Sequence, residues 1–303
     1  MANYDLVVVG EGVAGLTCAN EAARAGLKVA TFESTLFGGL VINIAELKGY
    51  PEGRETSGAE FASELVEKNA NLGIASVQEP VESVTASGPG FAIRTAGGSH
   101  QARQVIAASG ARMKKLAVPG EAEFEGRGVS QCADCDGPMF QDEAVVVVGG
   151  GDSALQEALV LAQWCGKVHI AHRGERFRAR PHFVEQVSAS PKISVMWNTT
   201  VNAILGTKMV EKVVLRDTKQ GGTREITSAG VFVCVGLAPS ADYLPAEVRR
   251  DERGFVVTGT GLDTSVPGIQ AIGAVRSGYS GLLKDAAAEA QQAAKAAVAK
   301  LKG

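Results

Sequence analysis

The sequence predicts an α/β fold made of two units of similar design. A short apolar segment that leads into a glycine-rich turn and then a helical pattern occurs twice, starting at Leu6 and at Ala144. Such an apolar segment is typical of a strand that is buried on both faces of a parallel sheet. The length of 303 residues agrees with two units, because a domain usually takes roughly 150 residues.

The first glycine-rich turn has the spacing of a dinucleotide site. Gly10 is placed for the tight turn, Gly12 lets the backbone approach a pyrophosphate, and Gly15 allows close packing of the helix on the strand. The start of the helix then offers free N–H groups to the phosphates. A second strand over residues 28–32 ends in Glu33, whose carboxylate can accept hydrogen bonds from a ribose diol. This order of features favours a dinucleotide site over a chance glycine-rich turn.

The second unit repeats the same order. A strand over 144–148 is followed by the glycine-rich turn, and Ala154 stands at the third glycine position, where a small residue still allows close packing. The candidate phosphate contacts are Gly149, Gly151, Asp152 and Ser153.

The second strand of this unit, over 167–171, ends in basic residues instead of an acid. His172, Arg173, Arg176 and Arg178 follow it directly. Guanidinium groups bind a 2′-phosphate through charge-assisted bidentate bonds, where an acid would repel it. We therefore interpret this segment as part of an NADPH site rather than as a basic surface that only faces solvent. Two unlike turns indicate two nucleotides, FAD at the first and NADPH at the second, with electrons passing from the nicotinamide to the flavin.

Two cysteines shortly before the second unit form a CxxC motif. The spacing of Cys132 and Cys135 lets the thiols close a small disulfide ring and typically lowers the pKa of one of them. There is no second CxxC and no His at ligand spacing, so no zinc site is expected. Asp, Gly and Pro around the cysteines are not typical of a core strand or helix, which favours redox chemistry over packing. From spacing alone, Asp136 is equally an acid/base group for thiol–disulfide exchange or a turn residue.

Composition excludes several classes of function. The formal net charge of −3 gives no electrostatic footprint for nucleic acid. No apolar run approaches the roughly 18 residues that span a bilayer, and the first residues resemble a strand rather than a secretory signal. Five cysteines are too few for a disulfide scaffold, so we expect a cytoplasmic location. The cysteines outside the motif are interpreted as packing residues: Cys18, Cys165 and Cys234.

In the order of its features, the chain resembles the bacterial low-molecular-weight thioredoxin reductases over essentially its whole length. Besides the motifs above, the matching segments are Phe37-Gly38-Gly39, Ala107-Ala-Ser-Gly110-Ala, Val118-Pro-Gly-Glu121 and Val235-Gly236-Leu-Ala-Pro239. The resemblance implies two Rossmann-like domains of the three-layer ββα type. An FAD domain is formed by residues 1–116 and 241–303, and an NAD(P)H domain, 117–240, is inserted between them and carries the CxxC.

The resemblance also assigns roles. It implies that Cys135 faces the flavin, that Cys132 attacks the partner disulfide and that Asp136 is the acid/base group. It adds Gly39, Gly110, Gly273 and the residue after Gly273 to the flavin contacts. A homodimer, two alternating domain orientations and a thioredoxin-like protein or a small disulfide as the electron acceptor are expected.

Four departures from the family pattern concern the nucleotides. They are Leu40 for Gln, Ala274 for Asp, Gly-Leu-Leu over 281–283 for Arg-Gln-Ala, and Gly174 for an arginine. Loss of one charge-assisted bond costs on the order of 1.5–3 kcal/mol. Other polar residues can compensate around the flavin: Asn43, Arg276, Tyr279 and Ser280. Gly174 leaves NADH as an alternative electron donor.

The leading hypothesis is therefore an NAD(P)H-dependent, FAD-containing disulfide oxidoreductase. One alternative is an FAD-dependent dithiol oxidase that passes electrons to O₂, although such an enzyme does not need the second phosphate loop. Another is a non-catalytic dinucleotide or redox sensor of the same fold, which only Leu40 and Ala274 support.

Overall fold

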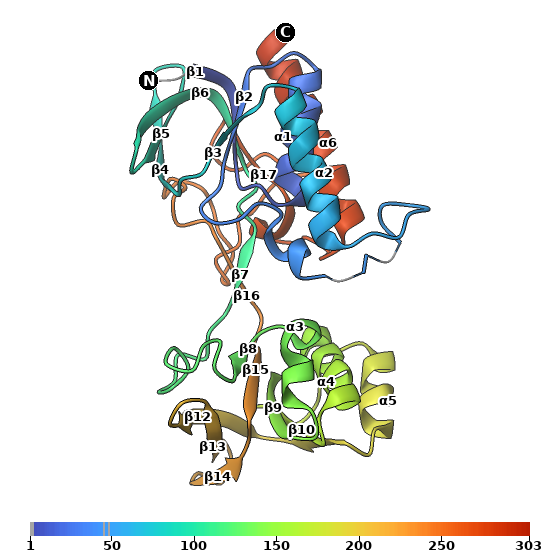
Figure 1. Ribbon diagram of the computed structural model, residues 1–303. Helices are drawn as coiled ribbons and strands as arrows, with labels where there is room; N and C mark the ends of the chain where they lie inside the picture. The colour runs from blue at the N-terminus through green and yellow to red at the C-terminus, as the bar shows by residue number, and fades with distance from the viewer. Residues whose placement is uncertain (1–2, 45, 48) are drawn as a thin grey trace. The chain divides into compact units, whose positions relative to one another are not determined.

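The computed structural model describes residues 3–44, 46–47 and 49–303. The chain divides into two compact units, each described separately below (Figure 1). Unit 1 comprises Met1–Arg112 and Ala238–Gly303, and unit 2 comprises Met113–Leu237. The two connecting segments, β7 (Ala111–Met113) and β16 (Leu237–Pro239), pair with each other as a two-stranded sheet. Unit 1 is thus built from both ends of the chain, and unit 2 from the segment between them.

Unit 1 is built around a sheet with the strand order β3-β2-β1-β6-β5-β4, and β17 also pairs with β6. The strands β1, β2, β3, β6 and β17 run parallel, whereas β4 and β5 form an antiparallel hairpin. The bounds are β1 (Asn3–Val9), β2 (Val29–Phe32), β3 (Ala75–Val77), β4 (Val81–Ser87), β5 (Gly90–Thr95), β6 (Gly98–Ala107) and β17 (Ile269–Ala271). The strand predicted from Leu6 is confirmed, because Leu6, Val7 and Val8 are fully buried in β1.

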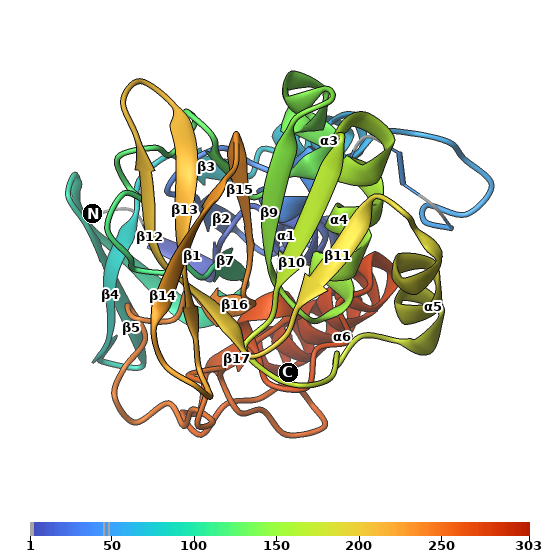
Figure 2. The same cartoon turned by 90° about the horizontal axis from the view of Figure 1, so that it is seen from below.

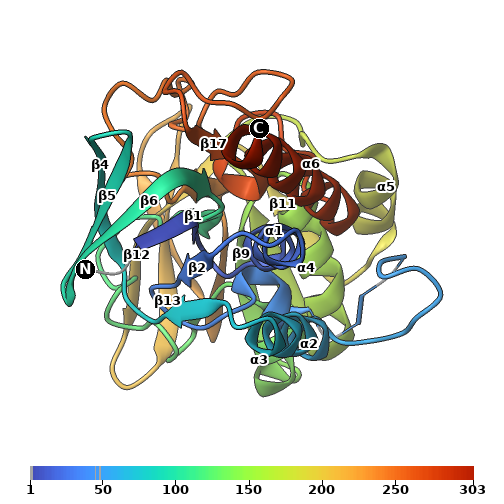
Figure 3. The same cartoon turned by 90° about the horizontal axis from the view of Figure 1, so that it is seen from above.

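Three helices cover one face of this sheet, and Figure 3 shows α1 and α6 side by side. They are α1 (Val13–Arg24), α2 (Gly58–Asn71) and α6 (Leu283–Lys302). The Ala-rich helix α6 buries Ala286, Ala290 and Ala294 in the same cluster as Ala19 and Ala22 of α1. Small side chains let two helix backbones approach closely, which explains the many alanines of this pair.

Unit 2 has three layers around a parallel sheet with the order β11-β10-β9-β15-β8 (Figure 2). On one face lie α3, α4 and α5, and on the other an antiparallel sheet with the order β12-β13-β14. The bounds are β8 (Val129–Ser130), α3 (Ala133–Asp136), β9 (Ala144–Gly149), α4 (Asp152–Trp164), β10 (Lys167–Ala171), α5 (Pro181–Ala189), β11 (Ile193–Met196), β12 (Thr199–Gly206), β13 (Val210–Asp217), β14 (Thr223–Thr227) and β15 (Gly230–Cys234).

The sheet of unit 2 is buried on both faces because its central strand is apolar at every position. Val145 and Val147 of β9 pack in the helix-side cluster, whereas Val146 and Val148 pack in the cluster shared with β12 and β13. Side chains alternate between the two faces of a strand, so the unbroken run of valines fills two cores at once. The α/β class with two strand–turn–helix–strand units is confirmed. None of the helices in the described ranges is long and apolar enough to cross a membrane.

Candidate active site and nucleotide loops

In the first glycine turn, a side chain would clash at Gly10 and Gly15 but not at Gly12, where a pyrophosphate is expected. A Cβ on Gly10, whose φ is +108°, would lie 2.4 Å from the carbonyl oxygen of Ala108, and one on Gly15 would lie 1.9 Å from the carbonyl oxygen of Gly10. Beside Gly12 the nearest atom to such a Cβ is 3.9 Å away. Helix α1 starts directly afterwards without a side-chain cap. Its free N–H groups and the open backbone at Gly12 fit a dinucleotide phosphate.

Glu33 lies directly after β2 and is held beside this turn. Its carboxylate accepts hydrogen bonds from the backbone N–H groups of Glu11 (2.9 Å) and Ser34 (2.8 Å). The Glu11 carboxylate, which the sequence did not single out, is only 2% exposed. It accepts hydrogen bonds from Thr31 Oγ1 (2.5 Å) and Ser76 Oγ (2.6 Å), which fix the turn to β2 and β3.

A second glycine pair packs against the first turn. Gly38 donates its N–H to the carbonyl oxygen of Glu11 (2.6 Å), and a Cβ on Gly39 would lie 3.5 Å from Gly12 Cα. The 3-10 helix η1 (Gly39–Asn43) begins here, with Leu40 and Asn43 exposed. Gly110, at a φ of +65°, lies in the loop after β6 that also closes around Gly10. The structure therefore brings Gly10, Gly12, Gly15, Glu33 and Gly39 together within unit 1.

The C-terminal turn of unit 1 carries a largely buried ion pair close to Ala274, the residue that replaces the family's aspartate. The 3-10 helix η3 (Gly273–Val275) approaches α1, and a Cβ on Gly273 would lie 3.0 Å from Ala14 Cβ. Glu289 of α6 accepts the N–H of Gly273 (2.8 Å) and binds the Arg276 guanidinium through two bonds, 3.0 Å from Nε and 2.6 Å from Nη2. The two side chains are only 18% and 12% exposed.

The polar side chains that were expected to compensate for Ala274 have partners inside the chain. Tyr279 donates its hydroxyl to the carbonyl oxygen of Leu282 (2.8 Å), and Ser280 donates to Asp285 (2.6 Å). Arg276 is bound to Glu289. These contacts shape the turn around Ala274 from within the protein.

The second glycine turn repeats the open space of the first. A Cβ on Gly149 would meet the carbonyl oxygen of Cys234 at 2.4 Å, whereas nothing lies within 4 Å of one on Gly151. Helix α4 starts after Gly151 without a side-chain cap on its N–H groups, and Ser153 is exposed. The geometry again fits a phosphate at a helix start.

The basic segment after β10 is tied to this turn. Arg180 donates to the Asp152 carboxylate from its backbone N–H (2.7 Å) and from Nε (2.7 Å), and these bonds lower the pKa of Asp152. Arg178 donates its backbone N–H to the carbonyl oxygen of Gly150 (2.8 Å). The side chains of Arg173 and Arg178 are exposed, and neither forms a salt bridge with any residue that the structure describes.

His172 has a bridging position rather than an exposed one. It is 6% exposed, and its ring nitrogens lie 3.0 Å from the carbonyl oxygen of Gly149 and 2.9 Å from that of Arg176. Its ring therefore joins the glycine turn to the arginine segment, whereas Arg173 and Arg178 leave their charged ends free for a ligand.

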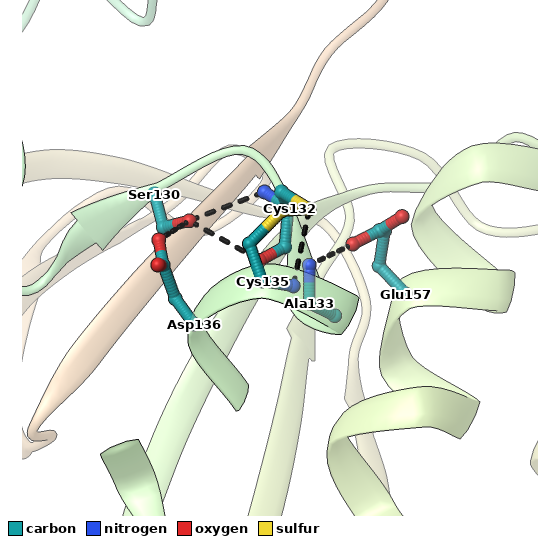
Figure 4. Close-up of a disulfide and its surroundings, with 6 residues drawn as sticks. All are labelled: Ser130, Cys132, Ala133, Cys135, Asp136 and Glu157. Carbon is teal, nitrogen blue, oxygen red and sulfur yellow. Dashed lines mark hydrogen bonds between the residues drawn. A yellow bond between two sulfur atoms is a disulfide. The ribbon is translucent and has the colours of Figure 1, made fainter. Parts of the chain in front are cut away.

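The cysteines of the CxxC motif form a disulfide, with their Cα atoms 5.4 Å apart (Figure 4). The motif forms a single helical turn in which only Ala133 is buried, so it is not part of a core helix. Cys132 caps the single turn α3, and its Sγ accepts the N–H of Cys135 at 3.2 Å. Pro138 lies in the first turn of the 3-10 helix η2 (Gly137–Phe140), where its missing N–H has no cost.

Asp136 lies beside the first cysteine and is held there by Ser130, another residue that the sequence did not single out. Ser130 donates its hydroxyl to Asp136 Oδ2 at 2.6 Å and accepts the N–H of Cys132 at 3.1 Å (Figure 4). The hydroxyl thus connects the carboxylate to the backbone of the redox pair.

A third carboxyl group approaches the motif from α4. The Glu157 side chain accepts the N–H of Ala133, the residue that follows Cys132. Burial raises the pKa of Glu157, partly offset by this hydrogen bond, and the nearby charge of Asp134 raises it further. The pair is consequently bordered by carboxyl groups from two helices.

The three remaining cysteines lack the features of reactive thiols. Burial raises the pKa of Cys18 and of Cys234 to about 12 and that of Cys165 to about 11, which keeps these thiols protonated. Among the residues that the structure describes, no group of three or more His, Cys, Asp or Glu side chains is arranged to hold a metal ion.

Comparisons with known proteins agree with this geometry. Residues 4–297 match the family model described as "Pyridine nucleotide-disulphide oxidoreductase". A thioredoxin reductase of Treponema pallidum is 41% identical over 277 residues, which cover 91% of this chain and 90% of that protein. A bifunctional thioredoxin reductase/thioredoxin of Mycobacterium leprae is 38% identical over 273 residues, which cover 89% of this chain and 60% of that protein. The crystal structure of Lactococcus lactis thioredoxin reductase superposes with a TM-score of 0.89 at 34% identity and covers 99% of both chains.

Proposed function

The chain belongs to the low-molecular-weight thioredoxin reductases within the pyridine nucleotide-disulphide oxidoreductase family, and from this premise we propose that its electron acceptor is a thioredoxin-like protein. The predicted enzyme class is confirmed: it is a disulfide oxidoreductase that uses NADPH and FAD. The dithiol oxidase and the sensor are not favoured, because the relatives are named reductases. The fusion of reductase and thioredoxin in the Mycobacterium leprae relative supports a thioredoxin-like acceptor over a small disulfide.

The observation that carries the proposal is the closed Cys132–Cys135 disulfide with Asp136 held beside it. FAD held by unit 1 would supply the hydride and electron-transfer chemistry that links NADPH to this disulfide. We assign Cys132 to the attack on the acceptor disulfide and Cys135 to the flavin side. Asp136, oriented by Ser130, delivers the proton to the leaving sulfur.

The two nucleotides are assigned to the two glycine turns. Unit 1 would hold FAD, with Gly12 and the start of α1 at the pyrophosphate and Glu33 at the ribose. Further contacts would come from Gly39, Asn43, Gly110, Gly273 and Ala274. Unit 2 would hold NADPH at Gly151, Asp152 and Ser153, with Arg173 and Arg178 at the 2′-phosphate. His172 would hold the arginine segment in place through its contact with the carbonyl oxygen of Arg176.

Anaerobic addition of NADPH to the purified protein tests the electron path. With two equivalents of NADPH per chain, loss of the flavin absorption together with the appearance of two new thiols per chain is expected, and two equivalents of oxidised thioredoxin should restore the flavin colour and the disulfide. Bleaching without new thiols would rule out the Cys132–Cys135 pair as the intermediate carrier. Recovery with glutathione disulfide or cystine, but not with thioredoxin, would replace the protein acceptor by a small disulfide.

We further propose a cytoplasmic homodimer. Three thiols outside the motif are free, which agrees with a reducing compartment. Fractionation of the source cells tests the location, and sedimentation equilibrium tests the oligomeric state.

A further inference from the structure

The side chain of Glu157 contacts the disulfide turn but has no place in the electron path described above. It extends from α4 toward α3 and binds the peptide N–H of Ala133 between the two cysteines (Figure 4). Ala133 is fully buried, so this N–H has no access to water. A buried N–H requires an acceptor, but an uncharged one would satisfy it. The use of a carboxylate at this place therefore points to an effect of its charge.

The groups around the pair have charges of a single sign. Asp134 and Asp136 belong to α3, Glu157 faces the pair from α4, and η2 carries no ionisable side chain. Strand β15 carries one titratable side chain, Cys234. Burial raises the pKa of its thiol, and the charge of Glu157 raises it further. In the described part of the chain, no Lys, Arg or His forms an ion pair with Glu157.

We propose that Glu157 is a positioning residue of the Cys132–Cys135 pair, which holds the Ala133 N–H with a negative charge and thereby keeps the couple strongly reducing. Opening the disulfide consumes two electrons and two protons and yields two thiols. Surroundings that stabilise a thiolate favour the open form and make a couple oxidising, whereas carboxylates oppose the thiolate. A pair that must reduce an acceptor disulfide needs carboxylates around it rather than groups that stabilise the thiolate. This inference therefore rests on the proposed function.

The ionisation of Glu157 itself sets the pH range of the effect. Its pKa is raised by burial, so the carboxyl group takes up a proton at a higher pH than an exposed glutamate does. The charge that opposes the thiolate is present above this pKa and disappears below it. The difference between the native protein and a variant without the charge should consequently be largest at alkaline pH and decrease toward acid pH.

The test is the equilibrium of the pair with dithiothreitol redox buffers, measured as free thiols in the FAD-loaded protein without nicotinamide or thioredoxin. Glu157→Gln keeps an oxygen acceptor for the Ala133 N–H and removes the charge. We expect it to shift the equilibrium constant at pH 8 about fivefold toward the open dithiol. The pH midpoint of alkylation of the reduced pair should move down in parallel. Glu185→Gln, on the exposed surface of α5, is the matched control and should leave both quantities unchanged.

Three further variants make the result decisive: Asp134→Asn, Glu157→Asp and Glu157→Ala. Asp134→Asn removes an exposed charge from α3 without breaking a hydrogen bond, so it should shift the equilibrium in the same direction by less, even where Glu157 variants fold poorly. Glu157→Asp should give an equilibrium constant between those of the native protein and Glu157→Gln. The inference is overturned when Glu157→Gln and Asp134→Asn both match the native protein, or when only Glu157→Ala differs. Because the assay needs no acceptor protein, its outcome is independent of whether thioredoxin is reduced.

Discussion

The hydroxyl of Ser130 lies 2.6 Å from the carboxylate of Asp136 and at the same time accepts the N–H of Cys132 at 3.1 Å. This one side chain fixes the orientation of the acid/base candidate relative to the attacking cysteine. A hydrogen bond to a charged group contributes about 1.5–3 kcal/mol. The Ser130–Asp136 contact is therefore strong enough to affect the rate of disulfide exchange.

Replacement of this serine should slow the exchange step. Ser130→Ala leaves Asp136 free to rotate, and we expect the prereduced protein to react about tenfold more slowly with oxidised thioredoxin, which corresponds to about 1.4 kcal/mol. Stopped-flow thiol measurements give this rate. Ser63→Ala, which removes an exposed hydroxyl on α2, is the control. Equal rates for both variants would mean that Asp136 needs no anchor.

Two glycines of the first turn should respond in opposite ways to the same substitution. Gly15→Ala forces its Cβ against the carbonyl oxygen of Gly10, so the FAD-free protein should lose about 1–3 kcal/mol of unfolding free energy. The methyl group of Gly12→Ala would lie 3.9 Å from the nearest protein atom, an ordinary contact, so this stability should not change. It should weaken FAD binding more than about tenfold because the methyl group blocks the phosphates. Urea unfolding and fluorescence titration with FAD separate the two effects. Normal FAD affinity in Gly12→Ala would place the pyrophosphate elsewhere.

The largely buried Arg276–Glu289 pair should contribute more stability than an exposed pair on the same helix. Arg276→Met leaves the Glu289 carboxylate charged and without its partner, so we expect a loss of about 3 kcal/mol in urea unfolding. Lys300→Met removes an exposed pair with Asp263 and should cost about 0.5 kcal/mol or less. Weakened FAD binding in Arg276→Met alone would show that the η3 turn depends on this pair. Similar losses in the two variants would contradict the burial argument.

The arginines after β10 should determine the choice between the two nicotinamide nucleotides. Arg178→Ala or Arg173→Ala removes a charge-assisted bond to the 2′-phosphate, so NADPH affinity should fall roughly ten- to a hundredfold while NADH affinity changes little. Calorimetric titration with each nucleotide measures the ratio. Arg224→Ala, an exposed arginine in β14, is the control. Equal losses for both nucleotides would place these arginines away from the 2′-phosphate.

Both glycine turns could be predicted because their signal is local. The apolar runs at Leu6 and Ala144, the glycines and the residues that end the second strands lie within a few tens of residues of one another. Each also imposes a backbone requirement that few other residues meet, as the φ of +108° at Gly10 illustrates. The helical form of the CxxC segment was missed, because the sulfur that caps its turn acts through a contact that residue propensities do not describe.

The contacts that orient the chemistry could not be predicted, because they join residues that are distant in sequence. Glu157 is 24 positions from Ala133, and Ser76 is 65 positions from Glu11. Nothing in the composition around Glu157 distinguishes it from an ordinary helix-surface glutamate. Only the packing of α4 against α3 turns it toward the disulfide.

The α/β class, the two dinucleotide turns, the redox pair and, through its resemblance, the family could be predicted from the sequence, because each depends on residues in fixed local order. Which side chains surround these elements depends on how the chain packs. It placed Ser130 on Asp136, Glu289 on Arg276 and Glu157 on the peptide between the cysteines. The physical reason is that burial and charge, which set the strength of a hydrogen bond and the pKa of an acid, are properties of packed neighbours and not of sequence neighbours.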